Sequence, residues 1–430
     1  MSGLLIAAPT SGSGKTTVTL GLLRALRNRG IMVKPGKAGP DYIDPAFHRI
    51  ACGHECVNFD PWAMRPEILH AQAATDGPLI IEAMMGLYDG AADHTGSPAS
   101  LARLLDLSVI LVVDCARMSH SVGALVSGYL GFDPAIRISG LILNRVGSAR
   151  HEAMLRAGLA SVPVPTVGVI MQDKLLSLPE RHLGLVQAGE IVGIDAFMEH
   201  AAGTVASCCD IEMLARLAQR RDGISDGVAC LIPPLGQHIA IAHDEAFAFV
   251  YPHLVAGWRE QGAELSFFSP LADEAPEAGA DAVFLPGGYP ELHADRLSAA
   301  QHFKGGMQAR AEAGAAIYGE CGGYMTLGEG LIDARGARHA MLGLLPLTTS
   351  FETRKRHLGY RRVTGLSGAF AGLMLTAHEF HYSTIVQEGQ AERLFDAVDA
   401  AGEFVGPSGL CRGNVFGSYM HVIDLAGAAN

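Results

Sequence analysis

Residues 4–17 read LLIAAPTSGSGKTT, and they carry the strongest structural signal in the chain. An apolar run leads into a glycine-rich turn, and a segment with helical spacing, 17–29, follows. A strand, a glycine-rich loop and a helix in this order are typical of a phosphate-binding P-loop. In such a loop, backbone N–H groups and the positive end of the helix face phosphate oxygens. We therefore predict a phosphate site here.

The loop matches the signature with one departure. Lys15 is expected to reach the β- and γ-phosphates of ATP, and the Thr16 hydroxyl is expected to bind Mg²⁺. The full signature has glycine five residues before Gly14, where this chain has Pro9. The predicted ATP-binding residues of the loop are Gly12, Ser13, Gly14, Lys15, Thr16 and Thr17.

Apolar runs alternate with helical segments along both halves of the chain. The runs that we interpret as buried strands are 4–8, 31–33, 79–81, 109–113, 141–143, 167–170, 239–242, 265–268, 282–285 and 315–318. The segments with helical spacing are 17–29, 97–105, 245–259 and 297–313. This alternation predicts an α/β fold in which helices cover parallel sheets.

A segment rich in Gly, Asp and Pro separates the two series and predicts a linker. It contains the run Arg220–Gly227 and the pair Pro233-Pro234, with one helical stretch at 211–219. We therefore predict two tandem domains: a P-loop domain over residues 1–195, a linker over 196–236 and a second domain over 237–430.

Acidic residues follow the loop at positions that suit a metal ion or a substrate. Asp41 and Asp44 stand in 34–45, KPGKAGPDYIDP, which we interpret as a turn-rich loop whose two lysines suit a polyanion. Glu82 ends the strand at 79–81, and Asp89 comes soon after it. Ligands of such sheets gather at the carboxyl ends of strands. The expected metal ligands are Thr16, Glu82 and Asp41.

Simpler roles are open for some of these polar residues. Asp44 stands before a proline and Asp89 before a glycine, so either could merely form a turn. Asp114 and Asn144 each end a strand. The Asn144 amide could pair with the adenine of ATP, or either side chain could cap the helix that follows.

The second half contains a candidate nucleophile. In 315–325, AAIYGECGGYM, a strand meets a helix at Cys321 between small residues, as in a nucleophile elbow. The helix N-terminus is expected to lower the pKa of the thiol. The candidate base is His421, and the N–H groups of Gly288 and Gly322 are the candidate oxyanion donors. The predicted catalytic residues are therefore Cys321, His421, Gly288 and Gly322.

Composition limits the function classes. The 430 residues are 49% hydrophobic and 18% charged, with a net charge of −12. This balance disfavours disorder and a nucleic-acid partner. The N-terminus lacks the basic region and cleavage site of a signal peptide, and no apolar run is long enough to span a membrane. We expect a cytoplasmic protein.

The motifs resemble two known families. The C-terminal half resembles class I glutamine amidotransferases in Pro-Gly-Gly at 286–288, Gly-Glu-Cys-Gly-Gly at 319–323 and the late His421. That family has a glutamate two residues after the histidine, where this chain has Ile423, followed by Asp424. The N-terminal half resembles dethiobiotin synthetase, a P-loop enzyme that phosphorylates a carboxylate.

The joined arrangement resembles the a,c-diamide synthases of cobalamin biosynthesis. The segments that carry the resemblance are 8–17, 39–45, 85–90, 244–249 and 378–383 (HEFHYS). It implies that ATP and Mg²⁺ activate the a and c carboxylates of hydrogenobyrinic or cobyrinic acid, with a lean towards the cobalt-free substrate. It also implies that Cys321 releases ammonia from glutamine. The dethiobiotin synthetase fold further implies a homodimer.

Two other functions fit the same motifs. One is cobyric acid synthase, which has the same modules, amidates four other corrinoid carboxylates and is typically longer. The other is a regulatory P-loop ATPase with an inactive amidotransferase domain. The presence of both Cys321 and His421 argues against this function.

Overall fold

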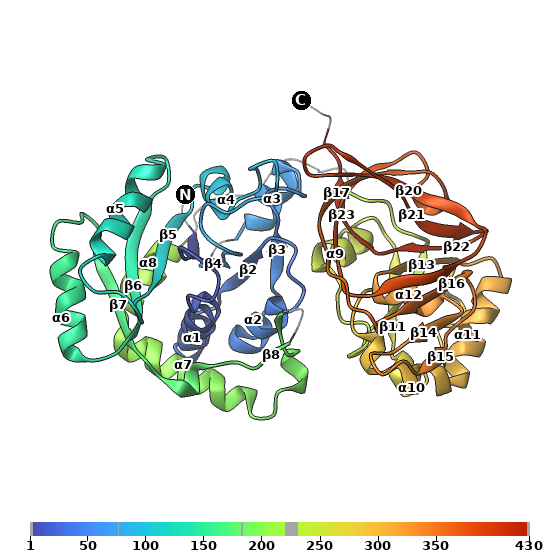
Figure 1. Ribbon diagram of the computed structural model, residues 1–430, viewed down its shortest axis with the longest axis horizontal. Coiled ribbons are helices and arrows are strands. Elements are labelled where there is room, and N and C mark those ends of the chain that lie inside the picture. The colour runs from blue at the N-terminus through green and yellow to red at the C-terminus, as the bar shows by residue number, and fades with distance from the viewer. Residues whose placement is uncertain (1–2, 76, 182–183, 220–230, 428–430) are drawn as a thin grey trace. The chain divides into compact units, whose positions relative to one another are not determined.

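The computed structural model describes residues 3–75, 77–181, 184–219 and 231–427, which form two compact units. The first unit comprises Met1–Trp62 and Pro66–Ala229, and the second comprises Ala63–Arg65 and Cys230–Asn430. Figure 1 colours the first unit from blue to green and the second from yellow to red. Each unit contains a sheet, helices and buried apolar side chains, which confirms the predicted α/β fold.

The first unit is built on a seven-stranded parallel sheet in the order β3-β2-β4-β1-β5-β6-β7. Its strands are β1 (Leu4–Ala7), β2 (Lys34–Ala38), β3 (Val57–Phe59), β4 (Leu79–Glu82), β5 (Ser108–Asp114), β6 (Ile138–Val146) and β7 (Thr166–Met171). A separate ribbon pairs β8 (Glu180–Arg181) with β9 (Gly184–Leu185). The helices are α1 (Lys15–Asn28), α2 (Asp44–Cys52), α3 (Pro66–Ala73), α4 (Pro98–Leu105), α5 (Val122–Phe132), α6 (Ala149–Gly158), α7 (Ile194–Cys208) and α8 (Ile211–Ala218).

The central position of β1 places the glycine-rich loop. β1 pairs with β4 on one side and with β5 on the other, and its apolar residues are fully buried. In the parallel register, Ile6 lies opposite Glu82, so the loop after β1 leaves the sheet beside the end of β4. Helices α1, α2 and α7 lie along the lower side of this unit in Figure 1, and α3 and α4 lie along its upper side.

The second strand differs from the prediction. We expected a strand at 31–33 and a turn-rich loop over 34–45, but β2 occupies 34–38 with the sequence Lys-Pro-Gly-Lys-Ala. A proline and a lysine argue against an inner strand. Pro35 is tolerated because β3 begins opposite Gly36, one residue later. Lys37 is tolerated because buried carboxylates surround it.

The predicted linker also needs correction. Helices α7 and α8 occupy most of 194–218, and both belong to the first unit. α7 packs against α1, where a methyl group on Gly21 would lie 2.6 Å from a methyl of Val205. This burial of α7 extends the first unit well beyond residue 195. The run Arg220–Gly227, on which the linker prediction rested, lies outside the described residues.

The second unit contains a ten-stranded sheet in the order β11-β10-β12-β13-β22-β21-β20-β17-β18-β23 and a four-stranded sheet in the order β15-β14-β16-β19. The strands are β10 (His238–Ala242), β11 (Glu264–Phe268), β12 (Ala282–Leu285), β13 (Ala316–Glu320), β14 (Gly330–Ile332), β15 (Arg338–Ala340), β16 (Leu347–Ser350), β17 (His357–Gly365), β18 (Met374–His381), β19 (Thr384–Glu388), β20 (Glu392–Asp399), β21 (Phe404–Arg412), β22 (Val415–Ser418) and β23 (Met420–Leu425). The helices are α9 (Pro252–Glu260), α10 (Ala294–Ala299), α11 (Gln301–Glu312) and α12 (Gly322–Leu327).

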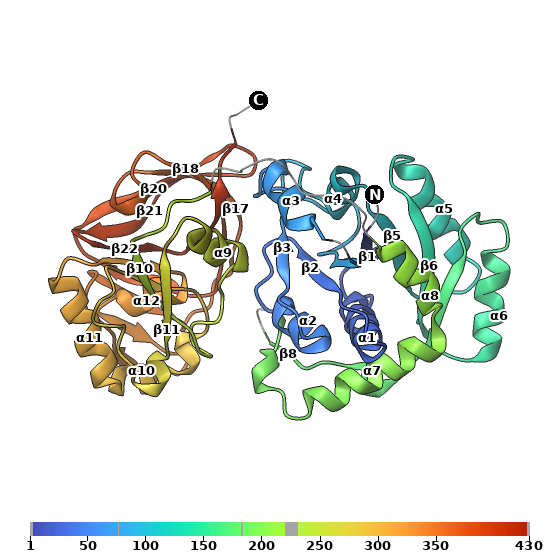
Figure 2. The ribbon, with the colours of Figure 1, turned by 180° about the vertical axis from the view of Figure 1, so that it is seen from behind.

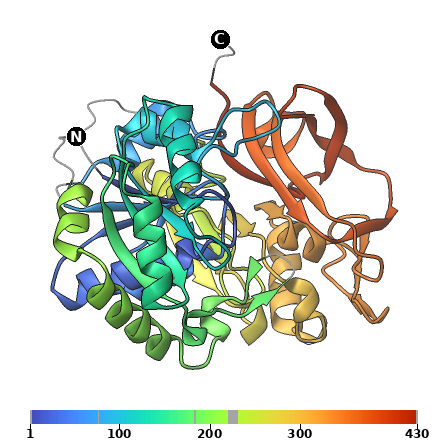
Figure 3. The ribbon, with the colours of Figure 1, turned by 60° about the vertical axis from the view of Figure 1, so that its left-hand side comes forward.

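The large sheet has a parallel part and an antiparallel part. The first five strands, β11 to β22 in sheet order, are parallel, and the remaining strands pair antiparallel. Figures 1 and 2 show the antiparallel strands β17 and β20 on one side of the unit and helices α10 and α11 on the other. The same strands are orange to red in Figure 3. The sequence analysis identified the parallel strands but not this antiparallel extension.

The first helix of the second unit is shorter than predicted. We expected a helix over 245–259, whereas α9 begins at Pro252. Proline favours the first position of a helix, and the residue before it is extended, as Tyr251 is here with φ −77° and ψ 117°. Among the described residues, no helix is long and apolar enough to cross a membrane.

Candidate active sites

The glycine-rich loop has the backbone that its sequence predicts. Gly12 and Gly14 adopt φ values of 76° and 88°, a left-handed conformation that favours glycine. A methyl group on Gly14 would also clash with Asn144 Nδ2. Pro9, the departure from the signature, uses its carbonyl to accept a hydrogen bond from the Tyr129 hydroxyl at 3.0 Å. The loop thus keeps a phosphate-binding conformation without the first glycine.

Lys15 and Thr16 point to the edge of the sheet where ligands gather. Lys15 Nζ donates to the carbonyl of Met85 at 2.6 Å. Burial lowers the pKa of Lys15 to about 8, although the nearby charge of Glu82 opposes this. The Thr16 hydroxyl donates to Glu82 Oε1 at 2.6 Å. Two oxygen atoms that suit Mg²⁺ are therefore adjacent.

Glu82 is the centre of a buried charged cluster. Its Oε1 lies 3.0 Å from Lys37 Nζ, and its Oε2 lies 2.7 Å from His48 Nε2. Lys37 also forms an ion pair with Asp44 and lies 3.6 Å from Asp41 Oδ2. Burial alone would raise the pKa of Glu82, but the charge of Lys37 and the hydrogen bond from His48 hold it well below its ordinary value.

The pKa values of Asp44 and Lys37 are also shifted by burial and by neighbouring charges. Burial and the charge of Asp41 raise the pKa of Asp44, whereas its ion pair and hydrogen bond with Lys37 lower it. Burial would lower the pKa of Lys37, yet Asp44 and Glu82 raise it well above its ordinary value. Lys37 is therefore a buried cation shared by several carboxylates. The expectation that both lysines of this segment contact a polyanion is not what the structure shows, since Lys34 Nζ donates to the carbonyl of Ala74 at 3.1 Å.

The four predicted acidic residues differ in their distance from the phosphate loop and in their contacts. Glu82 lies beside Thr16, while Asp41 and Asp44 reach Glu82 only through Lys37. Asp41 Oδ1 also accepts the N–H groups of residues 43 and 44 at the start of α2. Asp89 is exposed and accepts the N–H of Gly86 at 2.8 Å, as in a turn. His48 was not predicted at this site, because no phosphate-loop motif includes it.

Asn144 holds the loop itself. Its Nδ2 donates to the carbonyl of Ser13 at 2.9 Å, which is neither of the two roles expected for it. Asp114, at the end of β5, forms an ion pair with Arg145 at 2.6 Å. A pocket opens beside the loop, and its lining includes Thr17, Val18, Asn144, Arg145, Ile170, Leu176 and Val205. Its mixture of apolar and polar lining residues suits a flat heterocycle.

Cys321 lies at a strained turn between β13 and α12. Its φ of 46° and ψ of −101° are rare for a residue with a side chain and are typical of a nucleophile elbow. Glycine is required around it, because a methyl group on Gly323 would clash with the carbonyl of Leu285. The predicted lowering of the thiol pKa is wrong: burial and the charge of Glu291 raise the pKa of Cys321.

His421 and the nucleophile meet beside Gly287. A methyl group on Gly287 would clash with His421 Cε1 and would lie 3.1 Å from His421 Nε2 and 3.4 Å from Cys321 Cβ. Burial, with the charges of two nearby histidines, lowers the pKa of His421 to about 3. A methyl group on Gly322 would lie 3.0 Å from the Gly288 nitrogen, so the two predicted oxyanion donors are neighbours.

Neither residue at or beside the family's glutamate position contacts His421 through a hydrogen bond or an ion pair. Ile423 is fully buried and apolar, and Asp424 forms an ion pair with Arg65 at 2.9 Å. Instead, Glu320 Oε2 lies 3.7 Å from His421 Nδ1. The only available sequence signal was an acidic residue inside the elbow motif, directly before the nucleophile.

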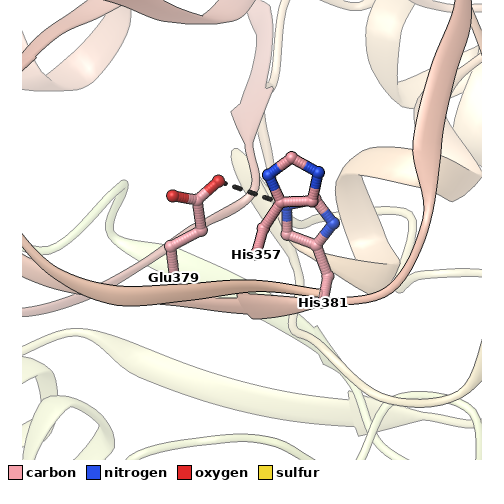
Figure 4. Close-up of side chains that lie close together, drawn as sticks. All are labelled: His357, Glu379 and His381. Atoms are coloured by element: carbon pink, nitrogen blue, oxygen red, sulfur yellow. Dashed lines mark hydrogen bonds and ion pairs between the residues drawn. The ribbon is translucent and has the colours of Figure 1, made fainter. Parts of the chain in front are cut away.

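A second cluster in this unit joins His357, Glu379 and His381, shown in Figure 4. Glu379 Oε1 lies 3.2 Å from His381 Nε2, and Glu379 Oε2 lies 2.6 Å from Arg361 Nη2. The two imidazole rings are stacked, with centroids 4.7 Å apart and planes 7° apart. Imidazole binds a metal in the plane of its ring, so parallel rings do not converge on one ion. We therefore assign no metal to this cluster.

Comparisons with known proteins match both units. Residues 4–186 match the family model of the CobQ/CobB/MinD/ParA nucleotide binding domain, and residues 238–429 match that of the CobB/CobQ-like glutamine amidotransferase domain. The hydrogenobyrinate a,c-diamide synthase of Sinorhizobium sp is 62% identical over 436 residues, covering 100% of both chains. That of Rhizobium meliloti is 62% identical over 99% of this chain and 100% of the relative, and that of Brucella abortus is 57% identical over 100% of both.

Replacing the buried lysine tests the charged cluster. Lys37→Met is expected to destabilise the first unit by about 3–5 kcal/mol, because it leaves buried carboxylates without their cation. Lys34→Met, on the same strand, is the matched control and is expected to cost about 1 kcal/mol for one lost hydrogen bond. Urea unfolding followed by circular dichroism measures both. Equal stability of the two variants would contradict the assignment of Lys37.

Proposed function

Because the chain belongs to the hydrogenobyrinate a,c-diamide synthase family, we propose that it amidates the a and c side-chain carboxylates of hydrogenobyrinic acid, using ATP and glutamine. One observation carries the proposal. The chain matches a synthase of this family over its full length, and it contains both a phosphate loop and a cysteine–histidine centre. The first supplies an activated carboxylate and the second supplies ammonia. The product belongs to cobalamin biosynthesis.

The first unit is proposed to activate the carboxylate. The backbone of residues 12–17 and Lys15 would bind the phosphates of ATP. Mg²⁺ would be held by the oxygens of Thr16 and Glu82, which are 2.6 Å apart, and would neutralise phosphate charge. Asp41, across Lys37, is proposed to face the substrate or the metal's water shell. Transfer of the γ-phosphoryl group to the substrate carboxylate gives an acyl phosphate, and ammonia then displaces phosphate to form the amide.

The pocket beside the loop is proposed to hold the base of ATP. Val18, Ile170, Leu176 and Val205 offer apolar contacts for a flat ring, and Arg145 also lines the pocket. Asn144 contributes indirectly, because its amide fixes the carbonyl of Ser13 in the loop. This arrangement would place the phosphates at the start of α1, where the helix dipole favours negative charge.

The second unit is proposed to release ammonia from glutamine. The Cys321 thiol gives its proton to neutral His421, and the thiolate attacks the side-chain carbonyl carbon of glutamine. The N–H groups of Gly288 and Gly322 stabilise the oxyanion. The histidine then protonates the amide nitrogen, ammonia leaves, and water hydrolyses the remaining thioester. Burial of the centre favours neutral forms of both residues before glutamine binds.

Three further features are proposed on the family resemblance. The substrate is the cobalt-free acid, since each of the three relatives described above carries that name. The enzyme works in the cytoplasm, where ATP and glutamine are available. It forms a homodimer, which analytical ultracentrifugation would test by its mass.

The substrate is tested by product mass. The protein is incubated with Mg-ATP, glutamine and either hydrogenobyrinic acid or cobyrinic acid. Two successive amidations of hydrogenobyrinic acid, and no more, are expected. Four amidations of an already diamidated corrinoid would instead identify a cobyric acid synthase. Glutamine hydrolysis without any corrinoid product would show that the chemistry is right and the substrate is wrong, and no hydrolysis would favour a regulatory ATPase.

Replacing the nucleophile separates the two reactions. Cys321→Ser is expected to abolish amidation with glutamine and to leave amidation with ammonium chloride near the wild-type rate, because only the second unit uses the thiol. Initial rates at saturating ammonium chloride measure this. Cys411→Ser, also a buried thiol of the second unit, is the matched control and is expected to retain glutamine use. Failure of ammonia to rescue Cys321→Ser would contradict this division of labour.

Replacing the loop lysine tests the synthetase site. Lys15→Ala is expected to lower ATP-dependent amidation by at least about 10³-fold with either nitrogen source, because the transferred phosphoryl group loses a charge that stabilises it. Glutamine hydrolysis in the second unit should persist. ATP turnover equal to that of the wild type would rule out the phosphate-loop assignment.

A further inference from the structure

Glu320 stands between the nucleophile and the histidine of the second unit. It is the last residue of β13, directly before Cys321, and its side chain is 2% exposed. Its Oε2 lies 3.7 Å from Nδ1 of the fully buried His421. β13 pairs with β22, and β22 runs almost directly into β23, which carries the histidine. The chain path thus brings the carboxylate to the imidazole.

Two donors fix the orientation of this carboxylate. Glu320 Oε1 accepts the Tyr318 hydroxyl at 2.9 Å and the backbone N–H of Val422 at 3.0 Å. With Oε1 held by both, Oε2 is left facing His421. A side chain held in this way has little rotamer freedom, which is what an orienting group needs.

The acids that the sequence pattern places near His421 lie elsewhere. The position two residues after His421, where the class I family has its glutamate, is Ile423. The pairing of β18 with β23 shifts register here, so that Thr376 faces Asp424 and Ala377 faces Val422, with Ile423 left over between them. Asp424 is held by Arg65 through both oxygens. Glu320, by contrast, lies beside the imidazole.

We propose that Glu320 is the positioning residue of the glutaminase centre, binding the Nδ1–H of His421 so that Nε2 stays unprotonated and faces Cys321. The inference rests on the proposed function of the second unit. The two imidazole tautomers differ in which nitrogen can accept a proton, and a carboxylate at Nδ1 selects the one that is a base at Nε2. Both His421 Nε2 and Cys321 Cβ lie within 3.4 Å of the place where a methyl group on Gly287 would stand, so the two residues border the same space.

The proton and charge balance follows from this arrangement. The S–H proton of Cys321 moves to Nε2, and the sulfur electron pair forms the C–S bond as the carbonyl electrons move to oxygen. His421 is then an imidazolium whose Nδ1–H remains on ionised Glu320. The imidazolium next passes the Nε2 proton to the amide nitrogen, the C–N bond breaks and ammonia leaves. Glu320 keeps no proton in either step and only offsets the charge of the imidazolium.

The charge state of Glu320 makes the reaction depend on pH. Burial raises its pKa to about 8, against the hydrogen bonds from Val422 and Tyr318. The titratable groups that face it are Tyr318 and Cys321 from its own strand and elbow, and His421 from β23. Protonated Glu320 would donate to Nδ1 and select the inactive tautomer, so glutamine hydrolysis should rise as pH increases through about 8.

The test compares Glu320→Gln with two controls in the full-length protein, with glutamine as the probe. Glu320→Gln keeps an oxygen for Val422 and Tyr318 but cannot ionise. Its kcat is expected to fall by at least about 10²-fold with little change in KM, and its pH rise should disappear. Tyr318→Phe removes one donor to Glu320 Oε1 that opposes its raised pKa, so the pH rise should remain but move to higher pH. Asp424→Asn neutralises the carboxylate that Arg65 holds and is expected to keep the wild-type pH rise and to lose no more than about 5-fold.

Several outcomes would overturn the inference. A Glu320→Gln enzyme with the wild-type pH profile would show that the residue is only structural. Equal losses of kcat in Glu320→Gln and Tyr318→Phe, with the pH rise intact in both, would also show that Glu320 is only structural. If Glu320→Gln does not fold, judged by circular dichroism, Glu320→Asp carries the test, because it keeps the charge but withdraws it from His421. Absence of glutamine hydrolysis by the wild type would instead overturn the proposed function, and this inference with it.

Discussion

Glu82 has no exposed surface, and its two oxygens are shared by Thr16, Lys37 and His48. A buried carboxylate without partners is very costly, so these groups must stay together for the unit to fold. They come from α1, β2 and α2, and Glu82 itself ends β4. The Glu82 carboxylate therefore links the start of α1 after the phosphate loop, the polar inner strand β2 and helix α2. The same atoms form the oxygen-rich edge that a metal–nucleotide complex needs.

In the second unit, the two buried ionisable residues of the candidate site are neutral instead of being paired as ions. Cys321 and His421 are both buried, and burial favours the neutral thiol and the neutral imidazole. On the proposed mechanism, a thiolate–imidazolium pair would form only during the reaction, when an oxyanion hole and a carboxylate could stabilise the charges. This would limit wasteful reactions of the thiol. The first unit thus keeps its charges paired at rest, whereas the second keeps them absent until they are needed.

Glycine makes the close approaches of the second site possible. Gly287 stands where any side chain would displace His421, and Gly322 brings its backbone against that of Gly288. Gly323 lets the helix after the nucleophile touch the carbonyl of Leu285. These residues hold backbone N–H groups near the reacting thiol without filling the space that glutamine must enter. The strained turn at Cys321 persists because this packing surrounds it.

Local sequence by itself determined most of the parallel strands, the phosphate loop and the elbow, because each depends on residues that are neighbours in the chain. It misplaced β2 and did not reveal β3. It also marked Lys15, Thr16, Glu82, Cys321 and His421 as reactive positions. Only the tertiary structure decided which polar groups meet. The sequence suggested that Lys37 contacts a polyanion, but in the structure Asp44 and Glu82 enclose it. Glu320 had no role in the sequence prediction, and only the position of β23 brings His421 beside it. Electrostatic partners are chosen by distance in space, and the spacing of residues along the chain does not contain that distance.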